Sequence, residues 1–130
     1  MAFADDAPIH LLMKKSRLKN KSGEWVEIGP RRIFFRSKWE VKYALNLERM
    51  KSIGAIKEWE YEPKTFWFLE IKRGVRSYKP DFRITNKDGS IWWAEVKGWM
   101  DPRSVTKIKR MKKYYPEEKI SLIGPDWFKG

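Results

Sequence analysis

Two short segments contain two carboxylates and a lysine, residue types that could bind a metal ion and stabilise charge on a phosphate. Asp81 lies within Tyr78-Lys79-Pro80-Asp81-Phe82, and Glu95 lies two residues before Lys97. Carboxylate oxygens are ligands that Mg²⁺ prefers, and a nearby ammonium group can stabilise negative charge on a phosphate or an attacking water. These residues therefore favour metal-assisted hydrolysis. The alternative is a solvent-exposed strand face that carries an ordinary mixture of Glu and Lys.

A hairpin brings the two segments together. Asn86-Lys87-Asp88-Gly89-Ser90 is a strong turn signal between two strand-like stretches, residues 78–85 and 91–97. A turn centred on Asp88 places Asp81 opposite Glu95, and residues directly opposite each other in an antiparallel pair share a face. Alternation predicts one face with Asp81, Arg83, Trp93, Glu95 and Lys97, and a core face with Phe82, Ile84, Trp92, Ala94 and Val96.

Two carboxylates directly across a strand pair repel each other. A bound cation, a raised carboxyl pKa or the neighbouring Lys97 would offset that repulsion. Mg²⁺ is often held by one or two carboxylates together with substrate phosphates and water. The pattern therefore predicts a magnesium site formed by Asp81 and Glu95.

A third carboxylate, Glu40, begins the apolar stripe of a helix predicted from Ser37 to about Ile53. In this position Glu40 could point inward toward an active site. The competing interpretation is a capping box, in which Ser37 and Glu40 satisfy the first backbone N–H groups of the helix. Position alone leaves both interpretations open.

The remaining elements predict a sheet with helices packed on it. The expected order is a hairpin over residues 24–35, the helix over 37–53, strands at 57–62, 65–71, 78–85 and 91–97, a helix from Pro102 to Tyr115, and a strand at 119–123. Asp101 is a suitable N-cap for the second helix, whose apolar stripe is Val105, Ile108, Met111 and Tyr115. This is an α/β or α+β fold. We expect a basic, poorly structured tail at residues 1–23 and a single domain over residues 24–130.

Composition narrows the classes of function. The 130 residues include 29 Lys and Arg, 17 Asp and Glu, one His and no Cys, with a net charge of +12. The charge favours a polyanionic partner. The absence of Cys excludes disulfides, zinc–thiolate sites and thiol nucleophiles. No apolar run approaches the length of a membrane span, and no signal-peptide pattern is present, so we expect a cytoplasmic protein without a membrane partner.

The motifs in combination resemble a known superfamily. Tyr78-Lys79-Pro80-Asp81-Phe82 followed by Trp93-Ala94-Glu95-Val96-Lys97-Gly98 is similar to the PD-(D/E)XK nuclease signature. With Phe35-Arg36-Ser37-Lys38-Trp39-Glu40, the order of motifs resembles bacteriophage endonuclease I, a family of phage Holliday-junction resolvases. It also resembles a phage-associated family of uncharacterised proteins that share this nuclease core. The resemblance covers about residues 31–124.

The resemblance implies a restriction-endonuclease-like core and cleavage of branched DNA, such as a four-way junction. It implies Asp81 and Glu95 as metal ligands, Lys97 as the catalytic lysine and Glu40 as the additional acid of the metal site. Mg²⁺ is the expected ion, with Mn²⁺ able to substitute, and paired incisions imply a homodimer. The alternatives are a nicking, homing or end-processing nuclease of the same fold, and a non-catalytic module that binds nucleic acid.

Basic side chains near these motifs could contact DNA phosphates. Some precede or follow Asp81, and others lie on the second helix, where the bland alternative is a solvated face. The candidates are Arg73, Arg76, Lys79, Arg83, Lys107, Lys109, Lys112 and Lys113. Trp93 and Trp99 are aromatic side chains that could stack on exposed bases.

Overall fold

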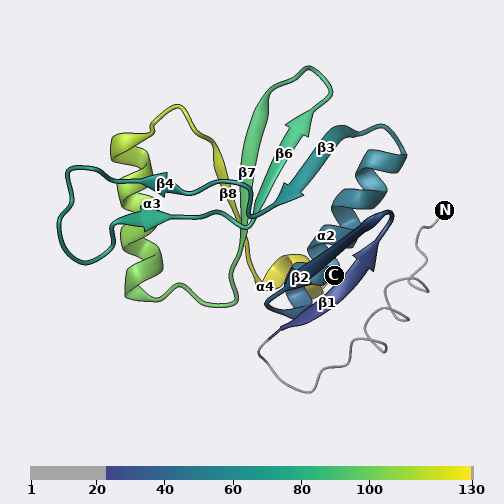
Figure 1. Ribbon diagram of the computed structural model, residues 1–130, viewed down its shortest axis with the longest axis horizontal. Helices are drawn as coiled ribbons and strands as arrows, with labels where there is room; N and C mark the ends of the chain where they lie inside the picture. The colour runs from purple at the N-terminus through teal and green to yellow at the C-terminus, as the bar shows by residue number, and fades with distance from the viewer. Residues whose placement is uncertain (1–22, 130) are drawn as a thin grey trace. The chain divides into compact units, whose positions relative to one another are not determined.

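Residues 23–129 of the chain are described by a computed structural model (Figure 1). His10 and nearly all of the predicted basic tail lie outside these residues. The chain divides into two compact units, one ending at Ala55 and the other beginning at Ile56.

The described residues of the first unit, 23–55, form a hairpin and a helix, as the sequence predicts. Its elements are β1 (Glu24–Ile28), β2 (Arg31–Phe35) and α2 (Lys38–Ser52). The strands pair antiparallel around Gly29-Pro30, and Gly29 adopts a positive φ of 60° that suits glycine. Alternate residues Val26 and Ile28 are buried, and α2 contacts both strands.

The second unit is built on a four-stranded mixed sheet in the order β3-β6-β7-β8. Its strands are β3 (Ile56–Tyr61), β6 (Phe82–Asn86), β7 (Ile91–Val96) and β8 (Ile120–Ile123). Antiparallel pairs join β3 to β6 and β6 to β7, whereas β7 and β8 are parallel. The parallel pair requires a crossover connection, which is supplied by α3 (Pro102–Tyr114). The short helix α4 (Pro125–Lys129) follows β8.

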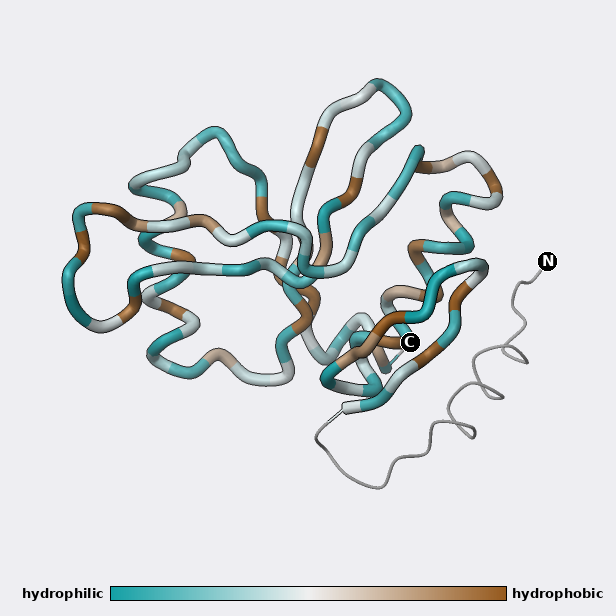
Figure 2. Tube along the Cα trace, in the orientation of Figure 1, coloured by the Kyte–Doolittle hydropathy of each residue, from teal (hydrophilic) through white to brown (hydrophobic). Residues whose placement is uncertain are grey.

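The β6–β7 register agrees with the hairpin predicted from the sequence. Phe82 pairs with Ala94, and Arg83 pairs with Trp93. The turn is closed by the Gly89 N–H, which donates to the Asn86 carbonyl oxygen at 3.0 Å, and Gly89 has a positive φ of 90°. Figure 2 shows this turn as a hydrophilic segment between strands that contain hydrophobic positions.

The predicted strand at residues 65–71 is wrong in extent and in place. Only β4 (Phe66–Trp67) is a strand, and it pairs with β5 (Ser77–Tyr78) in a separate two-stranded ribbon. The apolar run has a different cause. Phe66 and Phe68 are buried in a cluster with Tyr78, Trp93 and Met111, while Trp67 and Leu69 are exposed. The ribbon thus packs against the sheet and α3 and does not extend the sheet.

Three further predictions need correction. The stretch 78–85 is two strands, because Lys79-Pro80-Asp81 separates β5 from β6 and Pro80 has no N–H for a strand pair. Val105 is 42% exposed, and Ser104 and Met111 are the buried residues of α3. Trp93 shares the carboxylate face but is only 3% exposed, so it belongs to the core and is not available to stack on bases.

Among residues 23–129, no helix is long and apolar enough to cross a membrane.

Candidate active site

Asp81 is positioned where β6 begins. Its carboxylate Oδ2 accepts a hydrogen bond of 2.8 Å from the Val96 backbone N–H, and its own carbonyl oxygen accepts one of 2.7 Å from the Glu62 N–H. These bonds tie Asp81 to both neighbouring strands. The side chain is 7% exposed, so the carboxylate lies at the buried end of the β6–β7 pair.

Glu95 lies on β7, opposite the position of Asp81. Its carboxyl group accepts a hydrogen bond from the Asp81 backbone, so each acid is held by the main chain of the other's segment. Glu95 is 9% exposed, and its Oε1 accepts a 2.9 Å hydrogen bond from the buried Tyr78 hydroxyl. Its Oε2 lies 3.8 Å from Lys97 Nζ. The two oxygens of this carboxyl group therefore have different partners.

Burial dominates the electrostatics of Glu95. Removal from water raises the pKa of Glu95 above its ordinary value, although Tyr78, Lys97, the Asp81 backbone and Lys107 each act to lower it. The pKa of Tyr78 is also raised, first by burial and then by the adjacent Glu95 charge, so the phenol stays protonated. A cation beside these acids would oppose the effect of burial.

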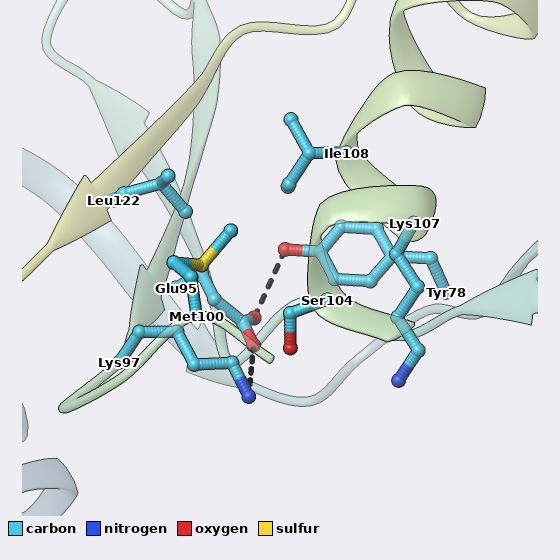
Figure 3. A pocket seen from close by; sticks show the side chains of 8 residues that line it. All are labelled: Tyr78, Glu95, Lys97, Met100, Ser104, Lys107, Ile108 and Leu122. Atoms are coloured by element: carbon cyan, nitrogen blue, oxygen red, sulfur yellow. Dashed lines mark hydrogen bonds and ion pairs between the residues drawn. The ribbon is translucent and has the colours of Figure 1, made fainter. Parts of the chain in front are cut away.

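Two lysines from different elements add positive charge near the Glu95 carboxyl group. Lys97 follows β7 directly, whereas Lys107 lies on α3 and is half-buried. Figure 3 shows a small pocket in which the Glu95 carboxyl group lies between the Tyr78 hydroxyl and the Lys97 ammonium group. Ser104 and Lys107 line the same pocket. The arrangement can hold a cation on its acids and a phosphate near its lysines.

Glu40 belongs to the first unit. Ser37 Oγ accepts a 3.1 Å hydrogen bond from the Glu40 N–H, as an N-cap does. Glu40 Oε1 accepts a 2.9 Å bond from the Arg36 N–H, one residue before the position expected in a capping box. Glu40 is 8% exposed and starts the buried face of α2. It thus acts as a cap at a buried position, and its predicted metal role stays a prediction.

Seven of the eight predicted phosphate contacts fall into two groups, and the eighth, Lys107, is half-buried on α3. Lys79 lies 3.7 Å from Glu62, and Arg83 bonds to Glu60, so both have acidic partners. The side chains of the other group are exposed; they are Arg73, Arg76, Lys109, Lys112 and Lys113. Contact with DNA stays a prediction for both groups.

Sequence reasoning missed the hydrogen bond of Tyr78 to Glu95. The tyrosine is part of the motif that precedes Asp81, but its contact depends on the β4–β5 ribbon, whose residues the sequence predicts as sheet strands. It also missed the burial of Ser104 on α3, because the apolar stripe of this helix was predicted to include Val105.

Within residues 23–129, no group of three or more His, Cys, Asp or Glu side chains is placed to hold a metal ion. Asp81 and Glu95 are therefore a pair of acids. Mg²⁺ is commonly held by one or two carboxylates, so such a pair is compatible with it.

Searches against known proteins bear on the family. No curated protein and no solved structure matches the chain. A family model described as "Protein of unknown function (DUF1064)" matches residues 24–125, a range that includes Glu40, Asp81, Glu95 and Lys97. Because this match covers most of the sequence, the chain belongs to the DUF1064 family.

Proposed function

We propose that this protein is a metal-dependent endonuclease that hydrolyses phosphodiester bonds in branched DNA, as junction-resolving enzymes do. The observation that carries the proposal is the buried pair of acids, Asp81 and Glu95, with Lys97 Nζ 3.8 Å from Glu95 Oε2. Buried charges of one sign are costly unless something compensates them. A bound divalent cation would compensate these two acids.

The acids fit a hard divalent cation. Asp81 and Glu95 offer only carboxylate oxygens, the donor type that Mg²⁺ prefers, and burial raises the pKa of Glu95 in a way that a cation would oppose. We assign Asp81 and Glu95 as the residues that would hold Mg²⁺, with Mn²⁺ as a substitute and Glu40 as an additional acid. When bound, such an ion supplies Lewis-acid polarisation of a phosphate and lowers the pKa of a water molecule.

The chain's own groups then have distinct tasks. Lys97 supplies a fixed positive charge beside Glu95, suited to the negative charge that develops on a phosphate during hydrolysis. Lys107 adds a second positive charge from α3. Because Glu95 and Asp81 are almost fully buried, water screens these interactions weakly.

The substrate follows from charge and from the resemblance. A net charge of +12 favours a nucleic acid, and the exposed lysines of α3 suit phosphate contacts. The preference for branched DNA, the restriction-endonuclease-like core and the homodimer rest on the similarity of the Tyr78–Phe82 and Trp93–Gly98 motifs to junction resolvases.

The test is cleavage of a synthetic four-way junction with Mg²⁺ and with EDTA. Asp81→Asn and Glu95→Gln should each reduce cleavage at least about 100-fold, because a metal site contributes several kcal/mol to the transition state. Binding to the junction, measured by gel shift, should persist. Asp88→Asn is the matched control, since Asp88 is an exposed carboxylate at the other end of the same hairpin.

Two results would contradict the proposal. Undiminished cleavage in EDTA would exclude the metal, and full cleavage by either site variant would exclude the acids. A panel of junction, flap, nicked and linear duplexes identifies the substrate. A preference for nicked or linear DNA would support nuclease activity and contradict the proposed preference for junctions.

A further inference from the structure

Tyr78 is the buried neighbour of Glu95 on the side away from Lys97. The side chain is 2% exposed and belongs to the hydrophobic cluster that includes Phe66, Trp93 and Met111. Packing of its ring against this cluster leaves the hydroxyl oxygen little freedom to move. The phenol is thus a fixed donor at the wall of the pocket.

The hydroxyl selects one oxygen of the Glu95 carboxyl group. It donates to Oε1 at 2.9 Å, while Lys97 Nζ is 3.8 Å from Oε2 (Figure 3). A phenol has one proton to donate, and here it is directed at Oε1. Glu95 therefore presents Oε2 toward Lys97 with Oε1 already engaged.

We propose that Tyr78 is a positioning residue that engages Oε1 of Glu95, so that this carboxylate offers a cation one oxygen and the site is biased toward Mg²⁺ and against Ca²⁺. The inference rests on the proposed function, because it concerns the same metal site. Mg²⁺ requires a near-octahedral shell and is bound through few protein oxygens, whereas Ca²⁺ takes six to eight ligands and readily uses both oxygens of one carboxylate. The hydrogen bond to Oε1 competes with its use as a second ligand to the same ion, so the two-oxygen mode is disfavoured.

The test compares two metals on the full chain without DNA. Isothermal titration of Mg²⁺ alone and of Ca²⁺ alone gives a Kd for each metal in wild type and in Tyr78→Phe. Phe keeps the ring and removes only the hydroxyl. We expect the Kd for Mg²⁺ to rise about tenfold, the usual lower range for loss of a hydrogen bond that orients a ligand. The Kd for Ca²⁺ should stay unchanged or fall.

The chain offers a matched control in the same aromatic cluster. The Tyr115 hydroxyl donates to the Trp67 carbonyl oxygen at 2.6 Å, and the Tyr115 ring packs 4.9 Å from Phe66. Tyr115→Phe removes one hydroxyl of the same kind without touching a carboxylate. It should leave both Kd values at the wild-type level.

The ratio of the Kd values for Mg²⁺ and Ca²⁺ distinguishes a positioning role of Tyr78 from a purely structural one. Equal weakening of both metals by Tyr78→Phe would overturn the inference, because a purely structural tyrosine affects both alike. Unchanged values for both metals would also overturn it. If wild type binds neither metal, the proposed function fails and the inference fails with it. If wild type binds Mg²⁺ and Tyr78→Phe leaves the ratio of the two Kd values unchanged, the inference alone fails.

A second measurement uses the wild-type protein, so it does not require a variant that folds correctly. The buried Tyr78 hydroxyl proton can be followed by NMR in wild type while Mg²⁺ is added. Retention of its hydrogen-bonded resonance supports the inference. Its loss on Mg²⁺ binding would show that the ion displaces Tyr78 from Oε1, which overturns it.

Discussion

Burial and positive charge act in opposite directions on the Glu95 carboxyl group, and burial has the larger effect. The pKa of Glu95 is raised above 4.5, so the folded protein holds this proton more tightly than the unfolded chain does. The sign follows from linkage: stability from this group is fully present below pH 4.5 and is lost as the pH rises through the raised pKa.

We therefore predict that the metal-free protein loses stability above pH 4.5 partly because Glu95 ionises. Glu95→Gln should remove that part, so the variant melts at a higher temperature than wild type at neutral pH. Thermal melts from about pH 4 to 8, with EDTA and with Mg²⁺, measure the effect. Mg²⁺ should raise the melting temperature of the wild type but not that of the variant. Parallel melting curves for wild type and variant across this range would contradict the prediction.

Glu40 allows its two roles to be separated by one substitution. Glu40→Gln keeps an oxygen that can accept the Arg36 N–H, and it keeps the backbone N–H bonded to Ser37. Stability should change by well under about 1 kcal/mol, the usual cost of losing an N-cap side chain. Junction cleavage should fall by orders of magnitude, because the negative charge is lost.

Ser37→Ala is the control for Glu40. It removes the N-cap acceptor, so it should cost about 1 kcal/mol of stability in a urea titration and leave most of the cleavage rate. If Glu40→Gln cuts the junction at the wild-type rate, then Glu40 is only a cap.

At the residue scale, the sequence predicted that Asp81 and Glu95 lie opposite each other, but it did not predict the hydrogen bond from Tyr78 to Glu95. Asp81 and Glu95 were predictable because a turn at Asp88 and strict alternation define the register, which the structure confirms. The hydrogen bond from Tyr78 to Glu95 joins β5 to β7, which belong to different sheets. No local sequence pattern signals a contact between strands that do not pair. For the same reason the burial of Trp93 could not be foreseen.

Among the elements, α3 separates lysines near the acids from lysines exposed to solvent. Lys107 lines the same pocket as Glu95, whereas Lys109, Lys112 and Lys113 are exposed. We predict that replacing these three by Gln weakens junction binding. The slope of log K against log salt should become shallower by about 0.9 for each phosphate that the variant no longer neutralises. Fluorescence anisotropy between about 50 and 200 mM salt measures this slope.

An unchanged slope in the triple variant would assign this face of α3 to solvent. The comparison needs a variant with the same loss of charge elsewhere. Lys42, Lys51 and Lys87, replaced together by Gln, lie on α2 and in the β6–β7 turn and provide that control.

The elements were best predicted where their signals are local. Ser37 and Asp101 cap the helices as expected, and the two hairpins close at Gly29-Pro30 and at Asp88-Gly89. The apolar run around Phe66 was ambiguous because buried positions on a ribbon and on a central strand have the same composition. Contacts of Phe66 with Trp93 and Tyr115 decide the matter, and these arise only in the folded chain.

For the whole molecule, the sequence pattern predicted the class of fold. The mixed α/β architecture is confirmed, with a four-stranded sheet and three helices among residues 23–129. The break between Ala55 and Ile56 has no linker signature, since no Pro, Gly or Ser cluster lies there beyond Ser52 and Gly54. A sequence can place a helix stop at Gly54 without indicating that contacts also divide there.

The order of the strands along the chain has a consequence for the route of folding. Both acids and Lys97 fall within residues 81–97, the stretch that forms the β6–β7 hairpin, whereas Lys107 arrives with α3 and β8 pairs with β7 only after that helix. Hairpins close within about 1–10 μs, and pairings that need a long crossover follow later. The two like charges thus meet with Lys97 beside Glu95 but before α3 brings Lys107. If the proposed metal site forms with this hairpin, a divalent cation should lower the barrier to folding in addition to stabilising the folded protein.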